Sequence, residues 1–321
     1  MPHVLIAGRL HPSGLALIGA AKGVTFDYVE ATGAADYLPL IGAAEGLVIR
    51  TQPLTAEIVA RASRLRVVSR HGVGYDSVDV GALSGRGIPL AIVGDVNARS
   101  VAEHAMALML ACAKDLAAMD AAVRIGPWAR RDGYAGQELY GARLLILGYG
   151  RSGRLLARIA AGFEMQVEAY DPFVGAGGDG PARLVGDLGA ALEAADFVSV
   201  HAPKGERPLL GAAEIAQMKR GAVLVNTARG GMVEEAALAA ALREERIAAA
   251  GIDVFASEPP AVGDPLTTLE RVVLTPHVAG LSREATERMA VVSVRNVLDF
   301  FAGRLDPDLV VNRDALAGAE R

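Results

Sequence analysis

The chain has 321 residues, of which 52% are hydrophobic and 21% are charged. This length exceeds the size at which one hydrophobic core usually stops growing, so we expect two domains with a cleft between them. Lys and Arg number 32 against 37 for Asp and Glu, which gives a net charge of −5 without a basic arm. That balance disfavours nucleic acid or an anionic membrane surface as a partner.

The start of the chain and its apolar stretches bear on location. The opening MPHVLIAGRL lacks a basic region followed by a long apolar stretch, and the most apolar later window is interrupted by Glu103, His104 and Lys114. The single Cys112 cannot form an internal disulfide, and its apolar surroundings favour a packed thiol. We therefore expect a cytoplasmic protein with no membrane partner.

Short apolar runs with the length of buried parallel strands recur in the first hundred residues. They lie at 4–7, 46–49, 65–69 and 89–93. Helix-like stretches at 12–21 and 55–62 alternate with them, the second with Thr55 at the N-cap position. This alternation predicts βαβ units.

A long apolar-periodic helix is predicted after Ser100, from residue 101 to 116 or beyond. The stretch 126–141, rich in Gly, Arg and aromatic residues, is interpreted as a crossing between domains. The fold class is therefore α/β, with two Rossmann-like doubly wound parallel-sheet domains and ligands at the carboxyl ends of the strands. The second series of strands is predicted at 144–147, 167–170, 197–201, 222–226, 250–254 and 272–275.

A glycine-rich motif, GYGRSG, follows the first strand of the second series and precedes a helix-like run at 154–160. Gly148 permits the tight turn, Gly150 lets the backbone approach a pyrophosphate, and Gly153 allows the helix to pack on the strand. Arg151 and Ser152 are expected beside the same anion. A plain structural turn is the alternative interpretation of three glycines in a chain that has 37.

An acidic residue ends the next strand. Asp171 lies 23 positions after Gly148 (171 − 148), near the offset at which an acid accepts hydrogen bonds from the adenine ribose of NAD. Residues 172–174 supply no cation for a 2′-phosphate, so NAD is expected rather than NADP. The alternative is that Asp171 only caps the turn before Pro172.

Three later strand-end loops carry polar residues that suit reduction of a 2-oxo acid. That reaction needs a cation to bind the carboxylate and polarise the carbonyl, and an acid to protonate the oxygen as hydride arrives. Arg229 and His277 fit these needs, and Glu258 is a candidate to hold the imidazole and favour its protonated form. Each also has a simpler interpretation, as a surface ion pair, a turn residue and a solvated loop charge respectively.

Together these motifs resemble the D-isomer-specific 2-hydroxyacid dehydrogenase family. The resemblance rests on GYGRSG, Asp171, VNTARGGMVEEAAL from 225, GIDVFASEPP from 251 and LTPHVAG from 274, and it extends over essentially the whole chain, including SRHGVGYDSVDV from 69. It implies a discontinuous substrate domain at 1–99 and 287–321 and an NAD-binding domain at 100–286. It also implies an NAD-dependent oxidoreductase that interconverts a D-2-hydroxy acid and its 2-oxo acid.

The same resemblance implies residue roles. Arg229 binds the substrate, Glu258 pairs with His277, and His277 exchanges the proton. Backbone groups of Gly72, Val73 and Gly74 would meet the substrate carboxylate, although an ordinary turn is the alternative. Further cofactor contacts are implied at Val73, Ala202, Pro203, Thr227, Ala228, Asp253, His277 and Gly280.

Within the family, GLVIRTQPLTAEIV from 46 and GPWARRDGYAGQEL from 126 are similar to 3-phosphoglycerate dehydrogenases. Arg50 and Arg70 would then suit a second anionic group on the substrate, though either could instead brace a loop. His71 is grouped with them and departs from the small residue often found there in that subfamily. The substrate would be 3-phosphoglycerate or another 2-hydroxy acid with a second anionic group.

Other functions remain open at this point. A dehydrogenase-like corepressor that senses NAD is one alternative, and a formate- or phosphite-type dehydrogenase is another. No metal site is assigned. The family also implies a homodimer, formed through the long helix from Val101 and the loop around Trp128.

Overall fold

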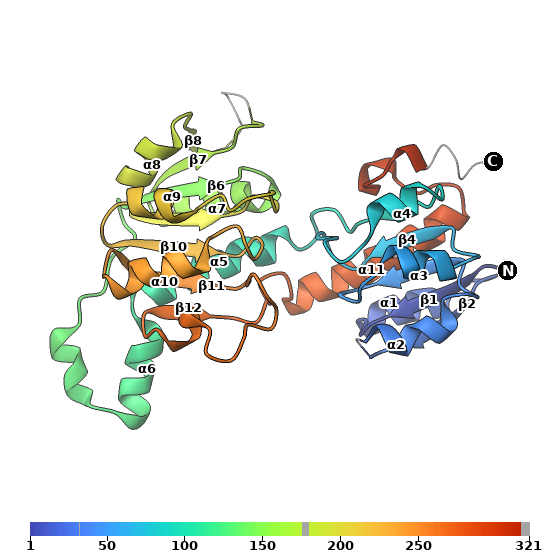
Figure 1. The fold of residues 1–321 in the computed structure, drawn as a ribbon, viewed down its shortest axis with the longest axis horizontal. Helices are drawn as coiled ribbons and strands as arrows, with labels where there is room; N and C mark the ends of the chain where they lie inside the picture. Colours follow the sequence, from blue (N-terminus) through green and yellow to red (C-terminus); the bar gives the residue numbers. More distant parts are fainter. Residues whose placement is uncertain (32, 175–179, 316–321) are drawn as a thin grey trace. The chain divides into compact units, whose positions relative to one another are not determined.

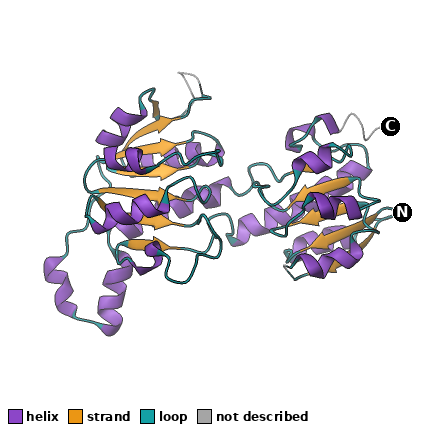
Figure 2. Ribbon diagram, viewed as in Figure 1, coloured by secondary structure: helices purple, strands orange, loops and turns teal. Residues whose placement is uncertain are grey.

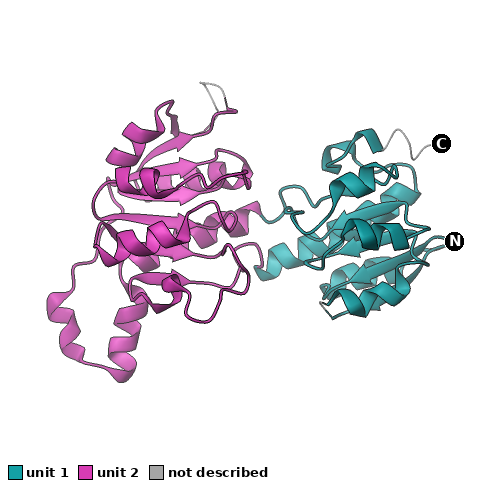
Figure 3. Cartoon of the chain, in the orientation of Figure 1, with its two compact units in different colours: residues 1–97, 282–321 teal, residues 98–281 magenta. Residues whose placement is uncertain are grey.

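The computed structural model describes residues 1–31, 33–174 and 180–315 of the chain. The chain divides into two compact units, which we call unit 1 (Met1–Asn97 with Ser282–Arg321) and unit 2 (Ala98–Leu281; Figure 3). The predicted boundaries, 99/100 and 286/287, lie two and five residues away. The second boundary differs because helix α11 (Arg283–Phe301) is not divided and buries Ala290, Val294 and Val297 in unit 1. The predicted cleft stays a prediction.

Unit 1 is built on a five-stranded parallel sheet in the order β2-β1-β3-β4-β5 (Figure 1). This is the second common doubly wound order, in which the winding reverses between β1 and β3. The strands are β1 (His3–Ala7), β2 (Thr25–Val29), β3 (Gly46–Ile49), β4 (Val67–Arg70) and β5 (Leu90–Ala91).

Helices cover both faces of this sheet. Alternate side chains of β1 explain the two layers, because Val4 and Ile6 pack toward α1 and α11 whereas Leu5 and Ala7 pack toward the other helices. The helices are α1 (Pro12–Gly19) with α11 on one face, and α2 (Ala34–Tyr37), α3 (Ala56–Arg61) and α4 (Val80–Ser84) on the other; the short 3-10 turns are η1 (Leu38–Leu40) and η4 (Pro307–Leu309).

Unit 2 contains a seven-stranded parallel sheet in the order β12-β11-β10-β9-β6-β7-β8 (Figure 2). Read from β8, this is the dinucleotide-binding order with one added strand, and the winding reverses between β6 and β9. The strands are β6 (Arg143–Leu147), β7 (Gln166–Tyr170), β8 (Arg183–Leu184), β9 (Phe197–Val200), β10 (Ala222–Asn226), β11 (Ile247–Ile252) and β12 (Val272–Leu274).

Two helical layers cover this second sheet as well. Leu144 and Ile146 of β6 face the layer formed by α5 (Ala98–Ala113) and α7 (Arg151–Gly162). Leu145 and Leu147 face the opposite layer, which consists of α8 (Leu188–Ala194), α9 (Ala212–Gln217) and α10 (Glu235–Arg243). Both sheets are thus parallel and covered on both sides, so the predicted fold class is confirmed.

Several elements differ from the sequence-based expectation. The single long helix is wrong, because Asp115 has a positive φ of 47° and separates α5 from α6 (Leu116–Ile125). The stretch 126–141 is not a domain crossing, since it lies within unit 2 and contains the 3-10 helix η2 (Trp128–Gly133). Strand β2 was not predicted because Thr25 and Asp27 interrupt its apolar pattern at an edge of the sheet.

In the part of the chain that the structure describes, we find no helix with the length and apolar character needed to cross a bilayer. The cytoplasmic location stays a prediction.

Candidate active site

The glycine motif forms the turn between β6 and α7. Gly148 has a φ of +96°, and a Cβ there would lie 2.6 Å from the Ala202 nitrogen, while a Cβ at Gly153 would lie 2.3 Å from the Gly148 oxygen. Both positions therefore require glycine. A Cβ at Gly150, the N-cap of α7, would have no neighbour within 4 Å, so the backbone there borders open space. Open space at a helix N-terminus suits an approaching pyrophosphate.

Asp171 follows β7 and is half-buried. Its Oδ2 accepts a hydrogen bond from the Tyr149 backbone N–H at 2.8 Å, and its Oδ1 accepts one from Phe173 N–H at 2.9 Å. The carboxylate thus ties the glycine turn to the end of β7. It caps the turn before Pro172, and it also lies beside the cofactor motif. Each oxygen can still accept a bond from a ribose hydroxyl.

Apart from Val73, which lies in unit 1, the other predicted cofactor positions lie after strands of the same unit. Ala202 and Pro203 follow β9, and Thr227 and Ala228 follow β10. The Thr227 hydroxyl is buried and has no hydrogen-bond partner among the described residues. An orphaned hydroxyl beside the glycine-turn edge of the sheet fits a bound ligand group. Gly280 lies on the loop between β12 and α11.

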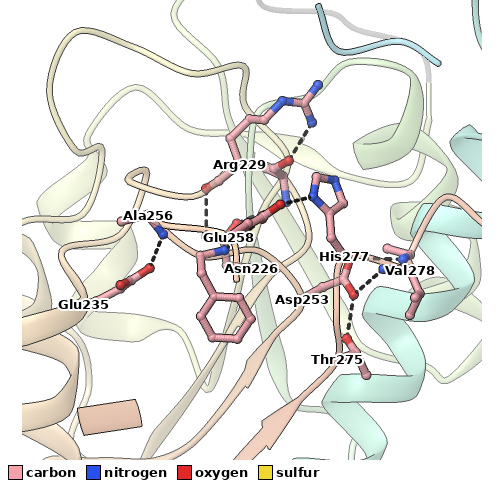
Figure 4. A network of polar contacts seen from close by, with 12 residues as sticks. Asn226, Arg229, Glu235, Asp253, Ala256, Glu258, Thr275, His277 and Val278 are labelled. Carbon is pink, nitrogen blue, oxygen red and sulfur yellow. Dashed lines mark hydrogen bonds and ion pairs between the residues drawn. The ribbon is translucent and has the colours of Figure 1, made fainter. Parts of the chain in front are cut away.

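Asp253 organises the loop after β12 (Figure 4). This side chain is fully buried, its Oδ1 accepts bonds from the Thr275 hydroxyl at 2.6 Å and from Val278 N–H at 2.9 Å, and its Oδ2 accepts one from Ala279 N–H at 3.0 Å. Three bonds to one carboxylate fix the backbone around His277. The predicted contact of Asp253 with the nicotinamide amide stays a prediction.

Glu258 and His277 form a close pair in unit 2. The imidazole Nδ1 donates to Glu258 Oε2 at 2.7 Å, and Glu258 Oε1 accepts a bond from Phe255 N–H at 3.1 Å. His277 has a φ of 53°, an uncommon conformation for a residue other than glycine. Half of its side chain is exposed (50%), so its second ring nitrogen is accessible to a ligand.

Arg229 lies on the loop after β10 and is half-buried. Its Nη1 donates to the Ala228 carbonyl at 2.7 Å, and its own carbonyl accepts a bond from Asn226 Nδ2 at 3.1 Å. Figure 4 shows the Arg229 guanidinium and the His277 imidazole on the same side of the site. A Cβ at Gly230 would lie 1.7 Å from the Phe255 oxygen, so glycine lets the Arg229 loop approach the loop that carries Glu258.

A pocket of about 410 Å³ borders this cluster within unit 2. Glu258, Thr267, Thr275 and His277 supply its polar lining, and the remaining lining residues are Phe255, Pro259, Pro260, Leu274 and Pro276. A carboxylate, an imidazole and apolar walls together suit an organic acid or a nicotinamide ring.

Unit 1 presents a cluster of cationic and histidine side chains at the carboxyl edge of its own sheet. Arg50 follows β3, and its Nη1 donates to the Arg9 carbonyl at 3.1 Å, at the point where the winding reverses between β1 and β3. Arg70 ends β4 and donates to the His71 carbonyl at 2.7 Å. Burial and the neighbouring Arg9 lower the pKa of Arg50.

His71 is a buried imidazole in the same cluster, with 4% of its surface exposed. Burial, together with the charges of Arg50 and Arg70, lowers its pKa to about 3, so the ring is neutral near pH 7. Its Nε2 is buried and lacks a hydrogen-bond partner within the described ranges. Gly72, Val73 and Gly74 follow in the chain, and a Cβ at Gly72 would lie 3.1 Å from Arg70 Nη1.

Some members of the site were not assigned a role from the sequence. His104 of α5 approaches Thr275 Oγ1 at 3.0 Å, and His201 at the end of β9 bonds Ser152 of the glycine motif at 3.1 Å. Polar residues at strand ends were the available signal for Thr275, Asn226 and His201. His104 gave no such signal because it lies inside an apolar helix.

The fold and the geometry of unit 2 define a dinucleotide-binding protein with an arginine, a glutamate and a histidine at the same edge of its sheet. Residues 106–279 match the family model described as "D-isomer specific 2-hydroxyacid dehydrogenase, NAD binding domain". The chain belongs to this family, and unit 2 contains its NAD-binding domain.

Three similar proteins illustrate the range of the family. The chain is 38% identical to a D-3-phosphoglycerate dehydrogenase of Mycobacterium bovis over 97% of its length but spans only 59% of that relative. It is 40% identical to a glyoxylate reductase of Korarchaeum cryptofilum, covering 81% of this chain and 80% of the other. A solved structure, the TT0316 protein of Thermus thermophilus, has a TM-score of 0.88 at 33% identity and covers 96% and 99% of the two chains.

Proposed function

We propose that this protein is an NAD-dependent oxidoreductase that interconverts a D-2-hydroxy acid and its 2-oxo acid. The observation that carries the proposal is the Glu258–His277 pair at 2.7 Å, held next to Arg229 by loops from β10, β11 and β12. Bound NAD supplies the carbon that accepts or donates hydride. The residues of the chain then have to bind the acid, polarise its carbonyl and move one proton.

Each residue has a defined task in this proposal. Arg229 binds the substrate carboxylate and withdraws electron density from the carbonyl oxygen. His277 donates a proton to that oxygen during reduction and removes it during oxidation, while Glu258 stabilises the charged imidazole and fixes its orientation. Asp253 keeps the His277 backbone in place through its bonds to Thr275, Val278 and Ala279.

A kinetic screen tests the proposal. NADH oxidation is measured with glyoxylate, pyruvate, hydroxypyruvate and phosphohydroxypyruvate, and NADPH is run in parallel. We expect turnover with at least one of these acids and a preference for NADH. Tight NADH binding without reduction of any 2-oxo acid contradicts the enzyme assignment and favours the NAD-sensing corepressor. NAD reduction by formate or phosphite favours a formate- or phosphite-type dehydrogenase.

We further propose that the substrate carries a second anionic group, as 3-phosphoglycerate does. Arg50, Arg70 and the neutral His71 supply donors at the sheet edge of unit 1, at the kind of winding reversal where ligands bind in doubly wound folds. Backbone groups of the 72–74 loop are proposed to meet the substrate carboxylate. The 38% identity to a D-3-phosphoglycerate dehydrogenase supports the same substrate class.

The charge proposal is tested by comparing Arg50→Gln with Arg9→Gln. Arg9 lies at the same edge but is largely exposed and pairs with Glu30, so it serves as a matched control. We expect Arg50→Gln to raise KM at least tenfold for phosphohydroxypyruvate and much less for glyoxylate, which lacks a second anion. An equal rise in KM for both acids contradicts an interaction of Arg50 with a second anionic group of the substrate.

A homodimer is also proposed, through the segment from α6 to the end of η2. Helix α5 is largely buried within unit 2, whereas α6 has no buried residue, and exposed apolar side chains lie on α6 and on the segment after it. These side chains are Leu116, Val123, Ile125, Trp128 and Tyr134. Sedimentation analysis of the wild type is expected to give a dimer. Combining Trp128→Glu with Ile125→Glu should convert it to a monomer, because charges then replace exposed apolar side chains. The control Val262→Glu, at another fully exposed site, should leave the dimer intact. A monomeric wild type rules this interface out.

A further inference from the structure

A half-buried histidine connects the middle of the unit 2 sheet to the cofactor motif. His201 follows β9, the strand at which the winding reverses next to β6. Its Nε2 lies 2.9 Å from Ser199 Oγ, and its Nδ1 lies 3.1 Å from Ser152 Oγ. Ser152 is the second residue of α7, beside the open space over Gly150. The imidazole thus bridges a strand hydroxyl and a hydroxyl at the expected pyrophosphate position.

The ring is neutral at physiological pH. Burial lowers the pKa of His201 to about 4. A neutral imidazole has one N–H donor and one acceptor nitrogen, so one serine must donate to the ring and the other must accept from it. Two arrangements satisfy this rule, and they differ in the direction in which the Ser152 hydroxyl hydrogen points.

The surroundings of Ser199 distinguish the two arrangements. Ser199 is fully buried, and throughout the described ranges its hydroxyl has no hydrogen-bond partner except His201. If the ring donated from Nε2, the Ser199 hydrogen would be buried without an acceptor, which is unfavourable. If the ring donates from Nδ1, Ser199 donates to Nε2 and every buried hydrogen is satisfied. The second arrangement leaves the Ser152 hydrogen available to an external acceptor.

We infer that His201 is a positioning residue for the cofactor: its Nδ1–H donates to Ser152, and the Ser152 hydroxyl donates to a pyrophosphate oxygen at the α7 N-terminus. This inference rests on NAD being the ligand of the proposed function. An oriented hydroxyl forms a charge-assisted bond to the anion without a competing bond to the ring. His201 therefore acts on cofactor affinity without touching the reacting atoms.

A double-mutant cycle measured by NADH binding tests the inference. We expect Ser152→Ala and His201→Gln each to weaken NADH about five- to tenfold, and the double variant to be no weaker than either, because both remove the same bond. His201→Asn, whose side-chain amide can replace the Nδ1–H donor, is expected to recover most of the affinity. The change should appear in KM for NADH rather than in kcat. Additive losses, or equal losses with Asn and Gln, overturn the inference.

The tautomer supplies a second readout that a purely structural role would not produce. We expect the ¹⁵N chemical shifts of His201 in the NADH complex to show protonation at Nδ1, although Nε2–H is the usual tautomer in water. A resonance pattern of Nε2–H overturns the inference. Neither NADH binding nor the ¹⁵N shifts require turnover. A coupled binding cycle in a protein that reduces no 2-oxo acid would therefore leave this inference standing while the proposed function fails.

Discussion

The carboxyl edges of the two sheets differ in how their charges are arranged. In unit 2, Asp253 and Glu258 accept five hydrogen bonds in total, three and two respectively, and thereby fix the loop that carries His277. In unit 1, Arg50 and Arg70 surround a neutral, buried His71. Similar parallel folds thus support a rigid polar network in one unit and concentrated positive charge in the other. We interpret the first as suited to proton transfer and the second to anion recognition.

The largest expected effect comes from removing the imidazole of the unit 2 edge. We predict that His277→Ala lowers kcat by about 10² to 10⁴, because a positioned acid–base group contributes this much. His3→Ala, at the amino end of β1, is the matched control and should retain turnover. An undiminished kcat of His277→Ala would contradict the assignment of proton transfer to the edge of unit 2.

The close approach of two unit 2 loops is the next target. A Cβ at Gly230 would meet the Phe255 carbonyl at 1.7 Å, so Gly230→Ala must displace the loop of Arg229 from that of Glu258. We predict a loss of about 10² in kcat, the typical effect of a misplacement of about 1 Å. Gly186→Ala, which meets nothing within 4 Å, is the control. Equal activities of the two variants would show that this contact does not position the site.

The buried His71 and the half-buried His201 provide a comparison by pH. Their folded pKa values, about 3 for His71 and about 4 for His201, lie below the ordinary 6.5, so the unfolded chain binds protons first on acidification. Stability from this source is complete above pH 6.5 and falls as the pH approaches the folded pKa. We predict that the free energy of unfolding falls between pH 6.5 and 4.5 by roughly 2 kcal/mol less in His71→Asn, and likewise in His201→Asn, than in the wild type. Denaturant unfolding at several pH values measures this free energy. Variants whose free energy of unfolding changes with pH as it does in the wild type would contradict the prediction.

Asp171→Ala should give the smallest change. We predict about tenfold weaker NAD binding and a narrower preference for NAD over NADP, because the ribose acceptor and its repulsion of a 2′-phosphate disappear together. Asp187→Ala removes an exposed carboxylate that caps the N-terminus of α8 in the same unit, and it controls for lost capping. A wild type that binds NAD and NADP equally well contradicts the role of Asp171.

Much of the fold could be predicted because buried parallel strands are continuous apolar runs, as β6 and β10 are. Strand β2 and the break at Asp115 escaped prediction because an edge strand and a left-handed residue leave weak sequence patterns. For the site, Arg229, Glu258 and His277 were predicted from polar residues after buried strands together with the resemblance to the family. The part played by Gly230, and the hydrogen bonds of His104 and His201, depend on contacts between residues distant in sequence, which no local pattern encodes.

The most direct test of the central claim is the fate of deuterium from NADH labelled at the transferable C4 position. The product of a 2-oxo acid reduced by the wild-type enzyme is analysed by mass spectrometry and chiral chromatography. We predict a D-2-hydroxy acid with deuterium bound to C2. Unlabelled product, or the L-isomer, would contradict the proposed hydride transfer at the Arg229–His277 site.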